Sequence, residues 1–439
     1  MSASLRRHLD TLAQAGELVR IRREVDPKFE LNGVVRAVQK ERNLPVLFEK
    51  VLGSRYRVAS NVMGNYGHLA RLIGADKRTA AKRWAEITKN GRVPDDSYAN
   101  ENDAYSEIAL SDLPQVRYFE KDAGPYLTAG VIVARDLDTG VQNLSYHRMQ
   151  IISPTELRCR LSTSGDLFRN HQKAEQRGAP LKAAVLLGLP PAVMMSGAAT
   201  ISPDQSEYGL AGMIAGKRFP LIPIGDSGLE APAGTEVIIE GEILANERRP
   251  EGPFGDWMDF YIPVMNNHVF VVKRVLARKD AIFYSINPGS TEEIAMTALP
   301  MAGSIYTAVR MWAPTVSDVS CFPNVQFCVL RMEKKFEGQP QRAIVAAFGA
   351  EMNRMLYCIA VDEDVDIHDP QDVMWAMSTR CRPDRDIFQI PGVPSFARDP
   401  HQMHWGRLGV DATRPLDSAA DFERKRIPGG EKIRLEDYL

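Results

Sequence analysis

The spacing of apolar residues divides the chain into three blocks, and the first block mixes helices with strands. Leu5, Leu9 and Leu12 recur at helical spacing, with a serine before them as a cap and a glycine after them as a stop signal. The pattern that follows predicts a strand over residues 17–25, a helix over 31–42 and a strand over 45–51. Residues 1–112 therefore form a predicted α/β domain, which ends in a polar linker over 95–112.

The second block, residues 113–293, carries mostly β patterns. Short apolar or alternating runs predict strands over 129–136, 141–152, 155–162, 180–188, 235–244, 268–280 and 281–287. One helical pattern, over 206–216, interrupts them. Many short strands in a single block predict a barrel or a sandwich.

The third block, residues 294–439, alternates helical and strand patterns again. Predicted elements lie within 295–312, 325–333, 341–366 and 369–380. This alternation predicts a C-terminal α/β domain, so the whole chain is a multidomain α+β protein. Its charge-rich last twenty residues are predicted to form a tail that docks on a neighbouring copy.

Composition and charge narrow the class of protein. The 439 residues hold 54 Lys and Arg against 56 Asp and Glu, so no sustained basic field points to nucleic acid. The longest apolar runs are broken by Gly and Pro and are too short for a membrane span. The first ten residues lack the apolar region of a signal peptide, and five scattered cysteines without a C-x-x-C pair fit reduced thiols. We therefore expect a cytoplasmic protein.

Several familiar signatures of chemistry are missing from the sequence. There is no G-x-x-x-x-G-K-[ST] loop, and the glycines of "GLAGMIAG" are wrongly spaced for a dinucleotide loop. Neither a G-x-S-x-G elbow nor an H-E-x-x-H pair occurs. The sequence thus gives little support to catalysis by a lone serine or cysteine, or by a zinc site.

The stretch "QNLSYHRMQ" gathers polar side chains in a predicted strand. Asn143 and Arg148 differ by an odd number, so in a regular strand they would face opposite sides of the sheet. One interpretation is an edge strand with a wetted polar face. The other is a functional site, which requires the strand to bulge or bend between these two residues.

The stretch "EGPFGDW" places Glu251 and Asp256 on either side of Gly-Pro-Phe-Gly. One interpretation is a turn whose acids point into water. In the other, the glycines let the backbone approach a ligand and the two carboxyl groups converge on one spot. An arginine partner would then keep one acid ionised while the other carries a proton.

Together these stretches carry a family resemblance. "QNLSYHRMQ", "SEYGLAG" and "EGPFGDW", in this order, are similar to the UbiD family of decarboxylases, which use prenylated FMN. "AGELVRIRREVDP" and "VDEDVDIHDPQDVMWAMSTRCRPDRD" resemble further stretches of that family, so the similarity covers almost the whole chain. It implies an N-terminal α/β domain (1–112), a central split β-barrel of flavin-reductase type (113–293) and a C-terminal α/β domain (294–439) with an oligomerising tail.

The resemblance also implies the residues of a site. Arg148, Glu251 and Asp256 match the catalytic trio, with Arg148 paired to Glu251 and Asp256 as the proton donor. Residues that match flavin-lining stretches are Tyr146, His147, Arg148, Arg160, Leu161 and Ser162. The flavin phosphate in this family is held through Mn²⁺ (or Mg²⁺) with K⁺ nearby, and the matching ligands here are Asn143, Glu207 and Asp166.

Asp166 is a departure from the family pattern. It falls at about the place where many relatives carry a metal-binding histidine, and a carboxylate oxygen suits manganese well. A register slip to Leu167 would instead remove one ligand. Asp166 is equally well read as a turn residue after Gly165.

The activity implied by the resemblance is reversible, non-oxidative decarboxylation of a (hetero)aromatic acid through a covalent adduct with prenylated FMN, with CO2 as the second product. Met296, Leu299, Met301 and Tyr306 would form an apolar slot for a flat ring, or simply pack in the core. A flavin prenyltransferase would supply the cofactor, and the family favours a homodimer or a homohexamer. Alternatives are an acrylic-type acid as substrate, a flavin-reductase-like electron carrier and a non-catalytic scaffold.

Overall fold

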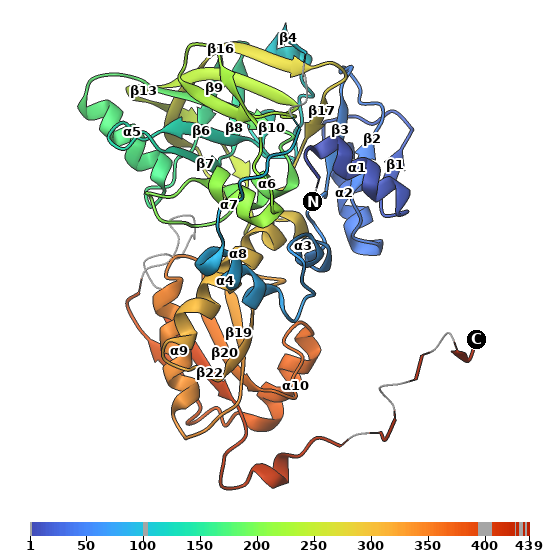
Figure 1. Cartoon of the computed structure of the whole chain (residues 1–439), viewed down its shortest axis with the longest axis vertical. Coiled ribbons are helices and arrows are strands. Elements are labelled where there is room, and N and C mark those ends of the chain that lie inside the picture. Colours follow the sequence, from blue (N-terminus) through green and yellow to red (C-terminus); the bar gives the residue numbers. More distant parts are fainter. Residues whose placement is uncertain (1, 100–103, 394–405, 426, 430–432, 435–436) are drawn as a thin grey trace. The chain divides into compact units, whose positions relative to one another are not determined.

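The computed structural model describes residues 2–99, 104–393, 406–425, 427–429, 433–434 and 437–439. The chain divides into two compact units (Figure 1). The first comprises Met1–Met301 with Phe322–Asn324, and the second comprises Ala302–Cys321 with Val325–Leu439. The predicted boundaries at residues 112 and 293 remain predictions.

A small sheet and four helices form the N-terminal part of the first unit. Helix α1 (Leu5–Gln14) begins after Ser4, whose side chain accepts a hydrogen bond from the backbone N–H of Arg7, and its three predicted apolar residues are buried. The sheet has the order β1-β2-β3-β17, with strands Val19–Ile21, Val46–Phe48, Arg57–Ser60 and Ile282–Tyr284. Helix α2 (Glu30–Glu41) matches its prediction, whereas the sequence reading missed α3 (Tyr66–Leu72) and α4 (Ala80–Asn90).

Strand β17 links this small sheet to the end of the predicted β block. It pairs in parallel with β3, with Ile282 opposite Arg57. A segment far along the sequence thus completes the N-terminal sheet. The predicted linker over 95–112 also contains a strand, β4 (Tyr105–Ile108), which pairs with β16 of the large sheet.

The β block forms one nine-stranded sheet with the order β5-β8-β9-β16-β13-β10-β6-β7, and β4 adds to β16. Its strands are β5 (Tyr126–Leu127), β6 (Val131–Arg135), β7 (Gln142–Tyr146), β8 (Met149–Ser153), β9 (Glu156–Cys159), β10 (Leu181–Leu187), β13 (Val237–Glu251) and β16 (Met265–Arg278). The end strands β5 and β7 are not paired with each other in the described part of the chain. The strand pairing among the described residues therefore shows no closed barrel. The expectation of a flavin-reductase type of barrel stays a prediction.

The single strand predicted over 141–152 is in fact two strands. β7 ends at Tyr146 beside β6, and β8 begins at Met149 between β5 and β9, near the other end of the sheet. His147 and Arg148 form the break between them. This is the bend that a site using both Asn143 and Arg148 requires.

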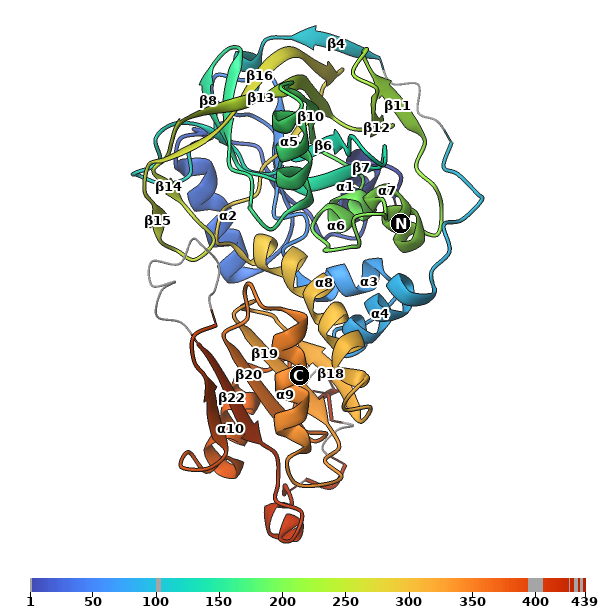
Figure 2. The ribbon, with the colours of Figure 1, turned by 90° about the vertical axis from the view of Figure 1, so that its left-hand side faces the viewer.

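Three further helices and two hairpins also belong to the described part of the first unit. Helix α5 (Asp166–Gln176) lies along β6, β10 and β13 (Figure 2), and α6 (Pro191–Gly197) packs on α7 (Glu207–Ala215). α7 confirms the helix predicted over 206–216, while α5 and α6 were missed. The hairpins are β11 (Leu221–Ile224) with β12 (Leu229–Pro232), and β14 (Phe254–Gly255) with β15 (Tyr261–Ile262).

The second unit is an α/β layer structure, as the alternating pattern predicts. Its sheet has the order β18-β19-β20-β22-β21, with strands Val316–Ser320, Phe327–Met332, Tyr357–Asp362, Arg407–Ala412 and Ile387–Ile390. Helix α9 (Gln339–Ala350) contacts β20 and β22, and α10 (Pro370–Arg380) covers an apolar cluster that includes Val361 and Val410. Helix α8 (Thr291–Arg310) begins in the first unit and ends in the second.

Part of the predicted tail packs on its own unit. The guanidinium of Arg424 pairs with Asp372 at 2.6 Å and lies 4.2 Å from the ring centroid of Trp375. Residues 426, 430–432 and 435–436 of the tail lie outside the described residues. None of the helices in the described part of the chain has the length and apolar character that a membrane crossing requires.

Candidate active site

Arg148 joins the two acids of "EGPFGDW". Its Nε and Nη2 donate to the two carboxylate oxygens of Glu251 at 3.1 Å and 3.0 Å, and its Nη1 donates to Asp256 Oδ2 at 2.6 Å. All three side chains are buried, with exposed fractions of 9% for Arg148, 1% for Glu251 and 3% for Asp256. The structure thus brings together the three predicted catalytic residues, which the alternative reading had placed on a wetted strand and a solvent-facing turn.

The backbone around the acids explains their glycines. Glu251 is the last residue of β13, and Gly252 follows with φ 95°, a left-handed conformation that a side chain would strain. A Cβ on Gly255 would lie 2.3 Å from the ring of Phe119, so only glycine fits there. The backbone N–H of Asp256 then donates to the carbonyl of Phe260 at 2.9 Å. These constraints turn the chain back so that Asp256 meets Arg148.

The charge of Arg148 is balanced by two buried acids. Burial by itself lowers the pKa of Arg148, but the charges of Glu251 and Asp256 outweigh burial and raise that pKa above its ordinary value. The guanidinium also lies 4.7 Å from the ring centroid of Phe254. Arg148 is therefore a permanent cation that holds two acids at fixed positions.

Two partners of Glu251 were missed by the sequence reading. The hydroxyl of Tyr126 donates to Glu251 Oε1 at 2.9 Å, and the amide of Asn267 donates to Oε2 at 2.8 Å. Tyr126 comes from β5 and Asn267 from β16, so only the tertiary fold brings them to Glu251. The strand patterns around them carry no signal that would single them out.

A third missed residue, Asp122, anchors the segment that carries Asp256. Its Oδ1 accepts from the backbone N–H of Gly255 at 2.8 Å, and its Oδ2 accepts from those of Tyr118 and Phe119 at 3.2 Å and 2.9 Å. Burial raises the pKa of the Asp122 carboxyl, although these three donors oppose the shift. Asp122 is only 1% exposed and fixes the backbone next to the acid.

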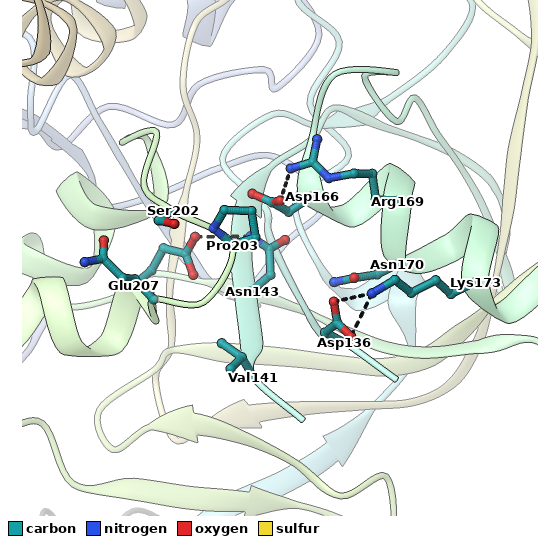
Figure 3. A pocket seen from close by; sticks show the side chains of 11 residues that line it. Asp136, Val141, Asn143, Asp166, Arg169, Asn170, Lys173, Ser202, Pro203 and Glu207 are labelled. Carbon is teal, nitrogen blue, oxygen red and sulfur yellow. Dashed lines mark hydrogen bonds and ion pairs between the residues drawn. The ribbon is translucent and has the colours of Figure 1, made fainter. Parts of the chain in front are cut away.

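The three predicted metal ligands line one cavity of about 100 Å³. Figure 3 shows this cavity between β7, α5 and the start of α7. Its lining residues are Asp136, Val141, Asn143, Asp166, Arg169, Asn170, Lys173, Ser202, Pro203, Gln205 and Glu207. Nine of these eleven residues are polar or charged, which suits a site for a phosphate and its counter-ion.

Glu207 is a buried carboxylate in this cavity that a bound cation would stabilise. Its oxygens accept from the amide of Asn143 at 3.1 Å and from the backbone N–H of Leu144 at 3.0 Å. Burial raises the pKa of Glu207 to about 7, because these donors do not fully replace water. No ion pair of Glu207 occurs among the described residues. An oxygen donor set of this kind suits a hard divalent ion.

Asp166 is engaged differently from what the resemblance implies. It is the first residue of α5, and its carboxylate pairs with Arg169 one turn later. On the far side of the cavity Lys173 pairs with Asp136 at 2.7 Å. Within the described part of the chain no group of three or more His, Cys, Asp or Glu is arranged to hold a metal ion. A cation here would therefore rely first on Glu207 and Asn143, and Asp166 could add its Oδ2, because its contact with Arg169 uses Oδ1.

The residues that match flavin-lining stretches also lie in the first unit. His147 Nδ1 is 2.9 Å from the carbonyl oxygen of Arg160, and its Nε2 is 2.9 Å from the hydroxyl of Ser145. The buried hydroxyl of Tyr146 makes no hydrogen bond to any described residue. Leu161 is buried, and Ser162 Oγ lies 3.1 Å from Ser164 Oγ. The Tyr146 hydroxyl is therefore available to bond a polar group of a bound cofactor.

Comparison with known proteins gives the same family over most of the chain. The matching family models are the N-terminal domain (residues 9–88), the Rift-related domain (92–291) and the C-terminal domain (294–412) of 3-octaprenyl-4-hydroxybenzoate carboxy-lyase, UbiD. These three ranges leave few residues between the N-terminus and residue 412 unmatched.

Individual relatives are similar along nearly their full lengths. The chain is 33% identical to an anhydromevalonate phosphate decarboxylase of Methanosarcina mazei over 95% of this chain and 97% of that protein. It is 29% identical to a phenolic acid decarboxylase of Bacillus subtilis over 94% and 92%. The UbiD-class enzyme HmfF from Pelotomaculum thermopropionicum in complex with FMN superposes with a TM-score of 0.93 and 33% identity, over 99% and 100%. An evolved dimeric form of HmfF in complex with prFMN gives 0.89 and 33%, over 100% of both chains.

Proposed function

Because the chain belongs to the UbiD family of carboxy-lyases, we propose that it is a decarboxylase that removes CO2 from an sp² carbon of an organic acid with prenylated FMN as cofactor. The observation that carries this proposal is the buried clamp of Arg148 between Glu251 and Asp256. Electrons left on an sp² carbon cannot be delocalised by a side chain. Prenylated FMN, when bound, supplies the covalent electron sink for them.

We assign to Arg148 the role of orienting the substrate carboxylate. A guanidinium offers planar, two-point recognition of carboxylates, which a lysine does not. Glu251 takes up two of its N–H groups and fixes the plane of the guanidinium. Because the guanidinium plane is already fixed, the substrate carboxylate is oriented when it binds, and no further orientational entropy has to be lost in the chemical step.

We assign to Asp256 the role of proton donor, which gives the substrate carbon a proton in place of the departing CO2. Asp256 Oδ2 accepts from Arg148 Nη1 at 2.6 Å, and its Oδ1 accepts from the backbone N–H of Trp257 at 2.9 Å. General acid catalysis by a positioned carboxyl typically contributes about 10²- to 10⁴-fold to the rate. The reverse transfer serves carboxylation, so one residue handles the proton in both directions.

The cofactor is assigned to the first unit. We propose that Tyr146, His147, Arg148, Arg160, Leu161 and Ser162 line the flavin, and that the large sheet serves as the split barrel that holds it. The phosphate would lie near the cavity of Figure 3, with Mn²⁺ or Mg²⁺ on Glu207 and Asn143 and with K⁺ nearby. HmfF has been solved with FMN and with prFMN, which supports this choice of cofactor.

The substrate is proposed to be a (hetero)aromatic carboxylic acid, and the relation to a phenolic acid decarboxylase supports this class. A non-aromatic acid of the acrylic type is the second candidate, because anhydromevalonate phosphate decarboxylases are among the relatives. A cytoplasmic homodimer or homohexamer, loaded by a flavin prenyltransferase, completes the proposal. A dimeric form of HmfF supports an oligomer.

The test is to co-express the chain with a flavin prenyltransferase, identify the bound cofactor by absorbance and mass, and measure CO2 release from aromatic and acrylic acids. Asp256→Asn should keep the cofactor and lose at least a hundredfold in turnover, since it removes the proton donor. An electron carrier would reduce flavin equally well with this change, and a scaffold would purify without flavin. Full decarboxylation by Asp256→Asn would contradict the assignment.

A further inference from the structure

Glu251 is surrounded by hydrogen-bond donors on both of its carboxylate oxygens. Oε1 accepts from Arg148 Nε at 3.1 Å and from the Tyr126 hydroxyl at 2.9 Å. Oε2 accepts from Arg148 Nη2 at 3.0 Å and from the Asn267 amide at 2.8 Å. A carboxylate has about four lone-pair sites, so these four donors fill it. A proton on either oxygen would have to displace one of the donors.

We infer that Tyr126 and Asn267 are positioning residues that hold Glu251 as an oriented carboxylate and thereby leave the proton-donor role to Asp256. The inference rests on the proposed function, because it divides the roles of two acids in the same site. Both residues act through Glu251 rather than on the substrate. Arg148 alone would satisfy only half of the Glu251 acceptors.

The two donors are fixed by the fold. Tyr126 is fully buried, and its ring centroid lies 4.4 Å from that of Phe254, which is also the ring beneath Arg148. Burial and then the charge of Glu251 raise the pKa of the Tyr126 hydroxyl far above its ordinary value, so it remains a donor. Asn267 is 7% exposed on β16 and cannot lose a proton.

Titratable groups that interact with Glu251 or with its partners in the described part of the chain include Arg148, Asp256, Asp122 and Cys159. Burial and then the charge of Glu251 raise the pKa of the Cys159 thiol to about 12, so it stays neutral below that pH. The carboxylate oxygens of Asp122 accept backbone N–H groups rather than touching Glu251. Removing Asn267 as a donor therefore changes the environment of Glu251, and removing the Tyr126 hydroxyl does the same while also ending its longer, 3.4 Å contact with Gln150 Oε1.

The test compares Tyr126→Phe and Asn267→Leu with the matched control Tyr118→Phe. Tyr118 is also buried, at 3% exposed, but its hydroxyl contacts Thr128 and Ser285 at 2.7 Å and 2.6 Å instead of Glu251. Two readouts are taken from each purified protein. One is the pH profile of kcat/KM for CO2 release, and the other is the infrared signal of protonated carboxyl groups between pH 7 and pH 5 without substrate.

We expect the acidic limb of kcat/KM to move up by about one pH unit in Tyr126→Phe and in Asn267→Leu, since a hydrogen bond to a charged group corresponds to about a tenfold change. Both variants should gain a protonated-carboxyl signal that adding Glu251→Gln removes, while the wild-type protein and Tyr118→Phe should not. Profiles and spectra identical to those of the wild-type protein would overturn the inference, as would a Glu251-dependent signal in the wild-type protein. If the wild-type protein releases no CO2, the proposed function fails, but the infrared comparison still decides the roles of Tyr126 and Asn267.

Discussion

At the scale of single residues, Glu292 is a fully buried acid outside the candidate site. Its oxygens accept from the backbone N–H groups of Asn61 and Met63 at 2.7 Å and 2.9 Å and from the Tyr284 hydroxyl at 2.6 Å. Burial raises the pKa of Glu292 to about 7, against an ordinary 4.5, and the three donors only partly oppose it. The carboxyl of Glu292 therefore connects α8 to the ends of β3 and β17. Burying it in the ionised form destabilises the fold, so its effect on stability depends on pH.

The sign of that dependence follows from the direction of the shift. The folded chain holds the Glu292 proton more tightly than the unfolded chain, so stability falls as pH rises from 4.5 to 7. The change corresponds to about 3 kcal/mol in the free energy of unfolding. Glu292→Gln should remove this part of the pH dependence of the free energy of unfolding, measured by denaturant titration at pH 5 and pH 7.5. The exposed Glu247→Gln is the control, and equal slopes in Glu292→Gln and the wild-type protein would refute the role.

At the scale of elements, the turn from β13 to β14 depends on Gly252. Its φ is 95°, and a Cβ there would lie 3.2 Å from the carbonyl oxygen of Pro263. Gly252→Ala adds strain of about 1–3 kcal/mol and pushes the turn away from Arg148. We expect kcat to fall at least tenfold while flavin binding persists.

Gly178→Ala is the matched control for this prediction. Gly178 has φ 66° after α5, and nothing lies within 4 Å of the position of its Cβ. The control carries similar backbone strain at the end of α5, outside the turn that holds Asp256, so it should lower the melting temperature without a comparable loss of kcat. Equal kcat losses in the two variants would mean that strain, rather than the position of Asp256, limits the reaction.

Elements were predictable where the local pattern was strong. The periodicity of Leu5, Leu9 and Leu12 identifies α1, because one apolar stripe is buried. Helix α5 was missed because two residues of its buried face, Asn170 and His171, are polar, so that no apolar stripe marks the helix in the sequence. The strand pattern predicted one continuous strand over 141–152, and only the functional interpretation of Asn143 and Arg148 required the break that separates β7 from β8. Tyr126, Asn267 and Asp122 could not be found in the same way, since distant strands bring them to the site.

At the scale of the whole molecule, the candidate site residues belong to the first unit. Arg148, Glu251, Asp256 and the cavity around Glu207 all lie within Met1–Met301. A ligand that binds only the folded state adds about 2.7 kcal/mol of stability at a hundred times its dissociation constant. The described C-terminal sheet from β18 to β22 contributes none of the assigned side chains.

Ligand binding should therefore protect the two units unequally. We expect FMN with Mn²⁺ to slow amide hydrogen exchange in β7, β8 and α7 much more than in β19 and β20, because local opening of the first unit would then cost the binding energy. Chelation of Mn²⁺ should reverse part of the protection near Glu207, whose buried carboxyl would otherwise gain a cation. Glu207→Gln should bind FMN with no response to Mn²⁺, while Glu247→Gln should behave like the wild-type chain. Equal protection of both units, or a Mn²⁺ response that survives in Glu207→Gln, would place the cofactor phosphate and its ion elsewhere.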